Sequence, residues 1–209
     1  MIVTIFGATG TVGKQLVKHA LFQGYTVRAF GRNVFTASFT DHKELQLIQG
    51  ALFDAAQVLD AIKGADVVLS ALGGSFDGLD KSRSLGMKNI TEQMSHAGVK
   101  RIIAIGGMGC LDGSNHKLIM EQPEFPAQYL AVSNEHLEAY HFLKASSLTW
   151  TFVCPPDIMN EDASGTYHTA ASIPPTPNQY KINAGNLAMF MVDEIKKNEY
   201  LLQRVGISN

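Results

Sequence analysis

Three glycines near the start of the chain, Gly7, Gly10 and Gly13, have a spacing that suits phosphate chemistry. A short apolar run precedes them and apolar residues at helical spacing follow, so the stretch predicts a strand, a turn and a helix. Glycines let the backbone of such a turn approach a pyrophosphate, and the first N–H groups of the helix attract the anion. A tight turn without a ligand would not explain this spacing. We therefore predict a dinucleotide-binding turn that also includes Thr9, Thr11 and Val12.

Arg32 follows the next apolar run, 26–30, which predicts the second strand. In dinucleotide-binding folds the end of this strand meets the adenosine ribose, where an acid binds the 2′-hydroxyl of NAD and an arginine accommodates the 2′-phosphate of NADP. No acid stands there in this chain, and a guanidinium matches a phosphate in charge and geometry. The sequence thus favours NADPH over NADH, with a solvated surface arginine as the alternative.

Several other predicted strands end at a glycine or proline turn. The carboxyl ends of parallel strands meet at one edge of a sheet, and ligands bind along that edge. We therefore expect the cofactor to lie against the ends of the fourth, fifth and sixth predicted strands and against the turn after the third. The residues expected to contact it are Ala71, Leu72, Gly73, Gly106, Gly107, Pro155, Leu52 and Phe53.

Strands and helices are predicted to alternate along the whole chain. Strands are expected at 1–6, 26–30, 45–50, 66–72, 101–105, 149–153 and 201–205, and helices after the glycine turn and at 54–62, 85–97, 133–145 and 187–195. This alternation predicts an α/β fold with a Rossmann-type, doubly wound parallel sheet. We expect a single NAD(P)-binding domain over residues 1–209, with a small substrate-side segment at about 155–182.

Local signals mark several of the expected boundaries. Asp54 and Ser133 are residue types that cap helix N-termini, and Gly98 is placed to end the helix before it. The stretch 111–130 reads as an irregular loop, and 157–180 is rich in Pro, Ser, Thr and Asn without helical periodicity.

Composition excludes several classes of function. The net charge is −2 and no basic block occurs, so binding to nucleic acid or to an anionic membrane is not expected. Two cysteines, Cys110 and Cys154, imply no disulfide framework and suit a reducing cytoplasm. The first strand is predicted from Met1, so no signal peptide is expected, and no apolar run is long enough for a membrane span. His136 and His141 are five residues apart, a poor spacing for a metal site, and none is expected.

Four motifs resemble the NmrA-like, NAD(P)-binding group of atypical short-chain dehydrogenases/reductases. They are the nucleotide loop 7–13, the strand-six signature 148–156, the Ser-Gly-Thr-Tyr segment 164–167 and the turn 106–111. Within that group the chain is similar to flavin and biliverdin-IXβ reductases and to bacterial NADH-flavin reductase-like proteins. The resemblance covers nearly the whole chain and implies an NAD(P)H-dependent oxidoreductase.

The chain departs from that family where its catalytic residues usually stand. The fifth strand ends in Gly106–Gly107, which carry no hydroxyl. Tyr140 and Lys144 have the Tyr-x-x-x-Lys spacing but lie too near the sixth strand. Counted back from the paired prolines, the family's lysine position falls near His136 and its tyrosine near Val132. We therefore predict that Tyr140 is a core or partly buried aromatic residue and that Lys144 is a solvated helix end.

Other positions also differ from the family pattern. Asp157 stands where biliverdin-reductase-like proteins have a histidine, and it is the one catalytic candidate, expected to orient substrate. Ala51 replaces an aspartate that faces adenine in relatives, so backbone groups around Leu52 and Phe53 would hold the base. Cys110 has no partner motif for nucleophilic chemistry and is expected to be a small buried residue.

A site without the tyrosine–lysine pair favours a reaction in which the protein supplies no acid. Hydride transfer to a flavin or quinone-like flat acceptor is such a reaction, because solvent can supply the proton. The protein is then a reductase acting as a monomer or homodimer. The alternative is a non-enzymatic NADP(H)-binding redox sensor of the NmrA type, which missing catalytic residues suit equally. An epimerase or dehydratase is less favoured, because the chain is short for the substrate domain of those enzymes.

Overall fold

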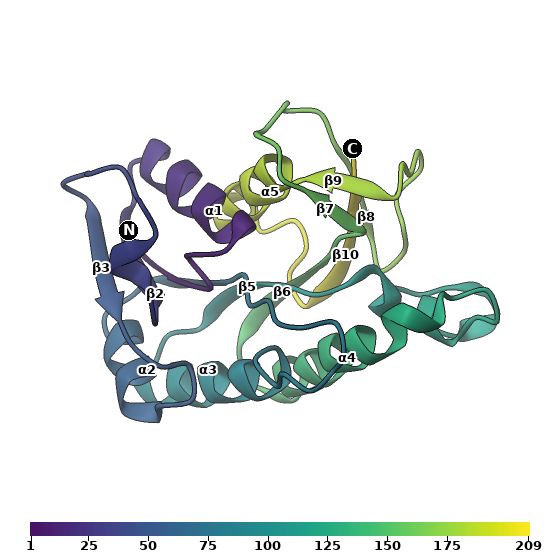
Figure 1. Ribbon diagram of the computed structural model, residues 1–209, viewed down its shortest axis with the longest axis horizontal. Coiled ribbons are helices and arrows are strands. Elements are labelled where there is room, and N and C mark those ends of the chain that lie inside the picture. Colours follow the sequence, from purple (N-terminus) through teal and green to yellow (C-terminus); the bar gives the residue numbers. More distant parts are fainter.

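The computed structural model describes all 209 residues. Its main sheet has the strand order β3-β2-β1-β4-β5-β6-β10-β8 (Figure 1). These strands are β1 (Ile2–Phe6), β2 (Thr26–Gly31), β3 (Leu45–Gln49), β4 (Val67–Ser70), β5 (Arg101–Ile105), β6 (Thr149–Cys154), β8 (His168–Ala171) and β10 (Gln203–Ser208). All neighbours pair in parallel except β8, which pairs antiparallel with β10 at the sheet edge. The chain crosses over on each side of β1, which is the predicted doubly wound, Rossmann-type arrangement.

Helices cover both faces of this sheet. They are α1 (Thr11–Phe22), α2 (Ala55–Ile62), α3 (Ser84–Ala97), α4 (Leu130–Ala145) and α5 (Ala184–Lys197). Helices α1 and α5 lie together on one face, and α2, α3 and α4 line the other (Figure 1). Central strands β1 and β4 are apolar throughout or nearly so because both of their faces are buried. No helix combines the length and the apolar character that crossing a membrane requires.

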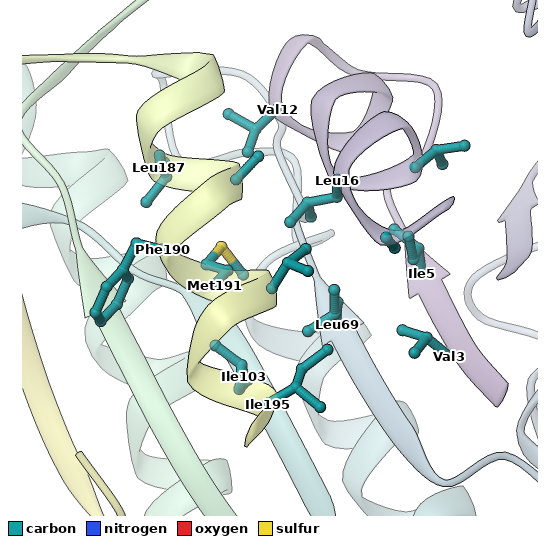
Figure 2. Packing of buried hydrophobic residues seen from close by; sticks show 14 of the residues in the cluster. Val3, Ile5, Val12, Leu16, Leu69, Ile103, Leu187, Phe190, Met191 and Ile195 are labelled. Carbon is teal, nitrogen blue, oxygen red and sulfur yellow. The ribbon is translucent and has the colours of Figure 1, made fainter. Parts of the chain in front are cut away.

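The α1–α5 side of the core illustrates how periodicity sets the packing. Leu16 of α1 and Leu187 and Met191 of α5 are fully buried and meet Ile5 of β1 and Leu69 of β4 (Figure 2). Residues at i and i+4 on a helix share one face, so both helices present an apolar stripe to the strands. This layer fixes α1 directly behind the glycine turn.

Two of the predicted helix boundaries are confirmed. The Asp54 carboxylate accepts a hydrogen bond from the Gln57 N–H at 3.0 Å and caps α2. Gly98 ends α3 in the left-handed conformation, with φ of 73°. Both outcomes depend only on neighbours within one helical turn, which explains why the sequence signals sufficed.

The N-terminus predicted for α4 was wrong. The helix begins at Leu130, and Ser133 lies inside it, buried at 6% exposure, instead of capping it. A 3-10 turn, Ala127–Tyr129, follows Pro126 and leads directly into the helix, so no side-chain cap is used. Val132 of the added turn is buried, and packing of this residue outweighs the serine signal.

The C-terminal part holds strands that periodicity did not reveal. β7 (Asp157–Met159) and β9 (Lys181–Asn183) form a separate two-stranded parallel sheet, and β8 lies within the stretch expected to be irregular. The final strand is Gln203–Ser208, later than the predicted 201–205. These strands are short and partly exposed, and their pairing is with residues distant in sequence, so local composition carried little signal.

Candidate functional site

The three glycines of the first turn have three different surroundings. Gly7 has a φ of +76°, and a Cβ there would lie 2.2 Å from the carbonyl oxygen of Ala71. A Cβ on Gly13 would lie 2.0 Å from the Gly7 carbonyl oxygen. A Cβ on Gly10 would meet only the Gly7 carbonyl, at 3.4 Å. The fold itself therefore requires glycine at positions 7 and 13, whereas position 10 is open and exposed on the outer side of the turn.

The N-terminus of α1 offers donors that no side chain uses. Gly10 is its N-cap, no side chain caps the helix, and the first turn contains no acidic residue. The first N–H groups of a helix lack partners within it and carry partial positive charge. Thr11 is exposed beside them, and Val12 points into the core. This uncapped end, with its open glycine, fits the pyrophosphate of a dinucleotide.

Arg32 lies immediately after β2, close to the glycine turn. A Cβ on the preceding Gly31 would be 3.3 Å from Cγ2 of Thr9, which brings the end of β2 against that turn. The Gln49 side chain donates to the Arg32 carbonyl at 3.0 Å and fixes the backbone. The Arg32 side chain is exposed, and its guanidinium makes no hydrogen bond or ion pair within the chain. It is free to bind an anion beside the turn.

The turn after β3 is partly committed to internal hydrogen bonds. The Ala51 N–H donates to the Gln57 side chain at 2.8 Å, and the Leu52 carbonyl accepts from Asn89 at 2.8 Å. Phe53 is 60% exposed. A base at this position would therefore meet the Phe53 ring and the unused backbone groups of the turn.

The ends of β4 and β5 leave different amounts of space. Ala71 and Leu72 are half-buried, and a Cβ on Gly73 would meet no atom within 4 Å. A Cβ on Gly106 would lie 2.3 Å from the Phe152 ring, so glycine is required there for packing.

Backbone hydrogen bonds connect the carboxyl ends of β5 and β6. The N–H of Met108 donates to the Pro155 carbonyl at 2.9 Å. Gly106 donates its N–H to the Val153 carbonyl at 2.6 Å. The residues after β5, 106–108, are therefore held against the end of β6 and the paired prolines. We call this surface the floor.

Tyr140 is partly buried and packs against the core, as predicted. Its ring centroid lies 5.6 Å from that of Trp150 and 5.5 Å from that of Phe152. Trp150 stands at the start of β6, so Tyr140 lies toward the amino end of that strand and away from the carboxyl edge. Lys144 is exposed, with its Nζ 5.8 Å from the centre of the Tyr140 ring. This pair does not lie at the edge where cofactor and substrate are expected.

A different set of polar residues lies at the carboxyl edge, and sequence reasoning did not assign it a function. His136, one helical turn before Tyr140, faces Gly107: a Cβ on that glycine would be 3.0 Å from Cδ2 of the imidazole. Its Nδ1 is buried without a hydrogen-bond partner. Burial, together with the nearby Arg83 cation, lowers the pKa of His136 to about 3, so the imidazole is neutral at pH 7. Counting back from the paired prolines places the family's lysine position near His136, but the sequence does not show what this side chain contacts.

Two charged residues near His136, Glu135 and Arg83, are held by hydrogen bonds of their own. Glu135 is buried and accepts hydrogen bonds from Lys81 Nζ at 2.6 Å and from Ser84 Oγ at 2.7 Å. Burial alone would raise the pKa of Glu135, but these two donors outweigh it and hold the pKa below its usual value. Arg83 donates to the carbonyls of Gly74 and Ser75, each at 3.0 Å. No sequence signal links residues so far apart.

The segment expected on the substrate side is fastened to α1 and α5. The Asp162 carboxylate accepts from Gln15 at 2.7 Å and from Lys18 at 3.1 Å. The Asn186 side chain accepts from the N–H groups of Ser164 and Gly165, at 2.9 and 3.0 Å. The turn of the Ser-Gly-Thr-Tyr motif is thus held by a buried amide. Sequence alone does not predict this contact.

Asp157 begins β7, directly after the paired prolines. It pairs in register with Lys181 of β9, and its side chain is exposed. Its carboxylate makes no hydrogen bond or ion pair within the chain, so it is available to a ligand.

Neither cysteine is chemically available. Cys110 and Cys154 are fully buried. Burial raises the pKa of the Cys110 thiol to about 12, and it raises that of Cys154 well above its usual value. The prediction that Cys110 is a small buried residue is confirmed.

Several known proteins are similar to this chain over nearly its full length. An uncharacterised protein of Bacillus subtilis, YwnB, is 25% identical over 99% of this chain and 98% of its own length. The solved structure of a "putative exported protein" of Burkholderia pseudomallei is 29% identical, with both chains fully covered and a TM-score of 0.85. That of a "putative NADH-flavin reductase" of Streptococcus pneumoniae is 25% identical over 100% of this chain and 99% of the other, with a TM-score of 0.84.

A comparison with sequence models of protein families identifies a nucleotide-binding family, as the geometry of the glycine turn suggests. The sequence model of a family described as NAD(P)H-binding matches residues 7–198, which span the glycine turn, the strand ends and α5. The uncapped α1, the open Gly10 and the free carboxyl edge fit a dinucleotide at the same place. The chain therefore belongs to the NAD(P)H-binding family, with the oxidoreductase-like Rossmann fold of the atypical short-chain dehydrogenases/reductases.

Proposed function

We propose that this protein is an NADPH-dependent reductase whose acceptor is a flat conjugated molecule, a flavin or a quinone. The observation that carries the proposal is the floor at the end of β5. Gly106 and Gly107 carry no hydroxyl there. Tyr140 packs against the core and Lys144 is exposed, so this pair places no proton donor at the floor. Such a floor suits stacking of planar rings better than protonation of an alkoxide. The similar structure from S. pneumoniae carries the name "putative NADH-flavin reductase", which supports the acceptor class.

Each part of the site has a separate task in this proposal. The free N–H groups of α1 bind the pyrophosphate, and Arg32 binds the 2′-phosphate. Bound NADPH supplies the hydride. Gly73 and Gly107 line the space of the acceptor, and buried Pro155 supports this surface through its hydrogen bond from the Met108 N–H. Asp157 orients the acceptor from the side of β7.

Arg32 gives a test of cofactor choice. The unmutated protein is expected to bind NADPH roughly ten- to a hundredfold more tightly than NADH, because a charge-assisted contact contributes about 1.5–3 kcal/mol. Arg32→Ala should bring the two affinities together by weakening NADPH alone. Isothermal calorimetry with each cofactor measures this, and the NADH affinity of the variant serves as its control. Equal affinities in the unmutated protein would count against the preference.

The acceptor class is tested by following NADPH oxidation at its absorbance band with FMN, riboflavin and a soluble quinone. We expect turnover in the unmutated protein and in Tyr140→Phe and Lys144→Ala, since neither side chain reaches the edge. Asp157→Asn should change the KM for the acceptor more than kcat. Loss of more than about a hundredfold in Tyr140→Phe alone, as from loss of a general acid, would disprove the proposal.

A binding protein that reports redox state is the second candidate. The position of Tyr140 against the core and of Lys144 on the surface favours it as much as it favours a flavin reductase. Tight NADPH binding with no reduction of any acceptor would establish it. We also propose a cytoplasmic location, supported by two unpaired thiols, although the similar B. pseudomallei structure is named as an exported protein. Gel filtration would decide between the proposed monomer and homodimer.

A further inference from the structure

His136 lies against Gly107, and the reaction proposed above gives this side chain no role. Gly107 is the second residue after β5 and carries no side chain. The imidazole of His136 fills that space from α4, with Cδ2 at 3.0 Å and Nε2 at 3.6 Å from the position of the absent Cβ. A polar ring from one element thus stands where a side chain from another would stand.

The two ring nitrogens of His136 have different surroundings. Nδ1 is buried and has no partner, whereas Nε2 makes no hydrogen bond within the chain and is not enclosed in the same way. A buried N–H without an acceptor is rarer and more costly than a buried lone pair without a donor. The proton of the neutral ring therefore belongs on Nε2, which lies 3.6 Å from the Cβ position of Gly107.

Burial and, after it, a neighbouring cation lower the pKa of His136 and keep the ring neutral. Arg83 approaches from the start of α3 and disfavours a second cation. Glu135, the adjacent residue, directs its carboxylate to Lys81 and Ser84, so its charge is already compensated. The imidazole therefore offers a single N–H donor over the whole pH range in which the protein is expected to work.

We propose that His136 is an acceptor-binding residue, which donates a hydrogen bond from Nε2 to a carbonyl oxygen or ring nitrogen at the edge of the flat acceptor. The proposal rests on the reductase function above and deepens it, since it selects conjugated acceptors that carry such an edge. On reduction the acceptor takes up the hydride and one solvent proton, and the imidazole keeps its own proton. Its contribution is stabilisation of the charge that develops at the acceptor edge.

Two substitutions distinguish the effect of the N–H donor of His136 from the effect of the space that its ring fills. His136→Gln keeps an N–H donor near the position of Nε2, and His136→Leu fills the space without one. With quinone or FMN we expect His136→Leu to lose about a hundredfold in kcat, the lower range for removal of one donor of this kind, and His136→Gln to recover most of it. The affinity for NADPH should be unchanged in both, and kcat of the unmutated protein should show no titration of this histidine between pH 5 and 8.

A binding assay keeps the inference testable if no acceptor is reduced. Quenching of FMN and riboflavin fluorescence is measured with NADP⁺ present, which cannot supply hydride, and the His136 ring nitrogens are followed by NMR after ¹⁵N-histidine labelling. We expect His136→Leu to bind FMN at least several-fold more weakly than the unmutated protein, and the Nε2 signal to shift when FMN is added. Binding without turnover would refute the reductase function and leave the role of His136 standing. Equal FMN affinity in His136→Leu and the unmutated protein, absence of FMN binding altogether, or equal losses in the leucine and glutamine variants would overturn it.

Discussion

Gly10→Asp is expected to abolish NADPH binding while leaving the protein folded. The new carboxylate would stand at the N-terminus of α1, in the space proposed for the pyrophosphate, and juxtaposed like charges cost several kcal/mol. The affinity should therefore fall by more than about a hundredfold. The fold should tolerate the change because a Cβ at position 10 meets nothing closer than 3.4 Å. Aspartate is also a preferred N-cap, so Tm should be equal or slightly higher.

The matched control is Gly10→Asn, which has the same size and no charge. It should lose distinctly less affinity than the aspartate variant, since only crowding of the phosphate remains. Calorimetry with NADPH and a thermal melt of each apoprotein provide the two readouts. Retained NADPH affinity in Gly10→Asp would show that the phosphate lies elsewhere, and a lowered Tm would show that position 10 is part of the structural turn.

Glu194→Ala is expected to cause a large loss of stability. The Glu194 side chain is fully buried and accepts from Arg101 at 3.2 Å, from Thr151 at 3.2 Å, and from the N–H groups of Glu199 and Tyr200 at 3.1 and 2.9 Å. Removing one member of a buried ion pair costs about 3–5 kcal/mol because the other charge is left without compensation. For a chain of 209 residues this lowers Tm by about 6–20 °C.

The neighbouring residue supplies the control for this second variant. Asp193 is paired with Lys197 at 3.7 Å on the surface, so Asp193→Ala should change stability by less than about 1 kcal/mol. Urea unfolding followed by circular dichroism measures both free energies of unfolding. Below the transition, Glu194→Ala should bind NADPH normally, because Arg101 begins β5 and lies at the opposite end from the floor. A loss within 1 kcal/mol in Glu194→Ala would mean that the network relaxes around the cavity.

Local features of this protein were determined by sequence alone. The glycine turn, the Asp54 cap, the Gly98 stop and the alternation of strands and helices all depend on residues within a turn or two of each other. Once alternation is known, the handedness of βαβ units leaves few arrangements, so the doubly wound type of the central sheet followed. The exclusion of Tyr140 from the site was also predictable, because its distance from the sixth strand is a count along one helix.

The tertiary structure alone decided which polar side chains stand at the carboxyl edge. His136 takes up the space above Gly107, and Glu135 reaches Lys81, 54 residues away, because α3 and α4 pack side by side. The tertiary structure also distinguishes the glycines of the first turn. A Cβ on Gly13 would collide with the backbone of Gly7, whereas a Cβ on Gly10 would meet almost nothing. Such contacts depend on how elements distant in sequence pack together, and a pattern within one element cannot encode them.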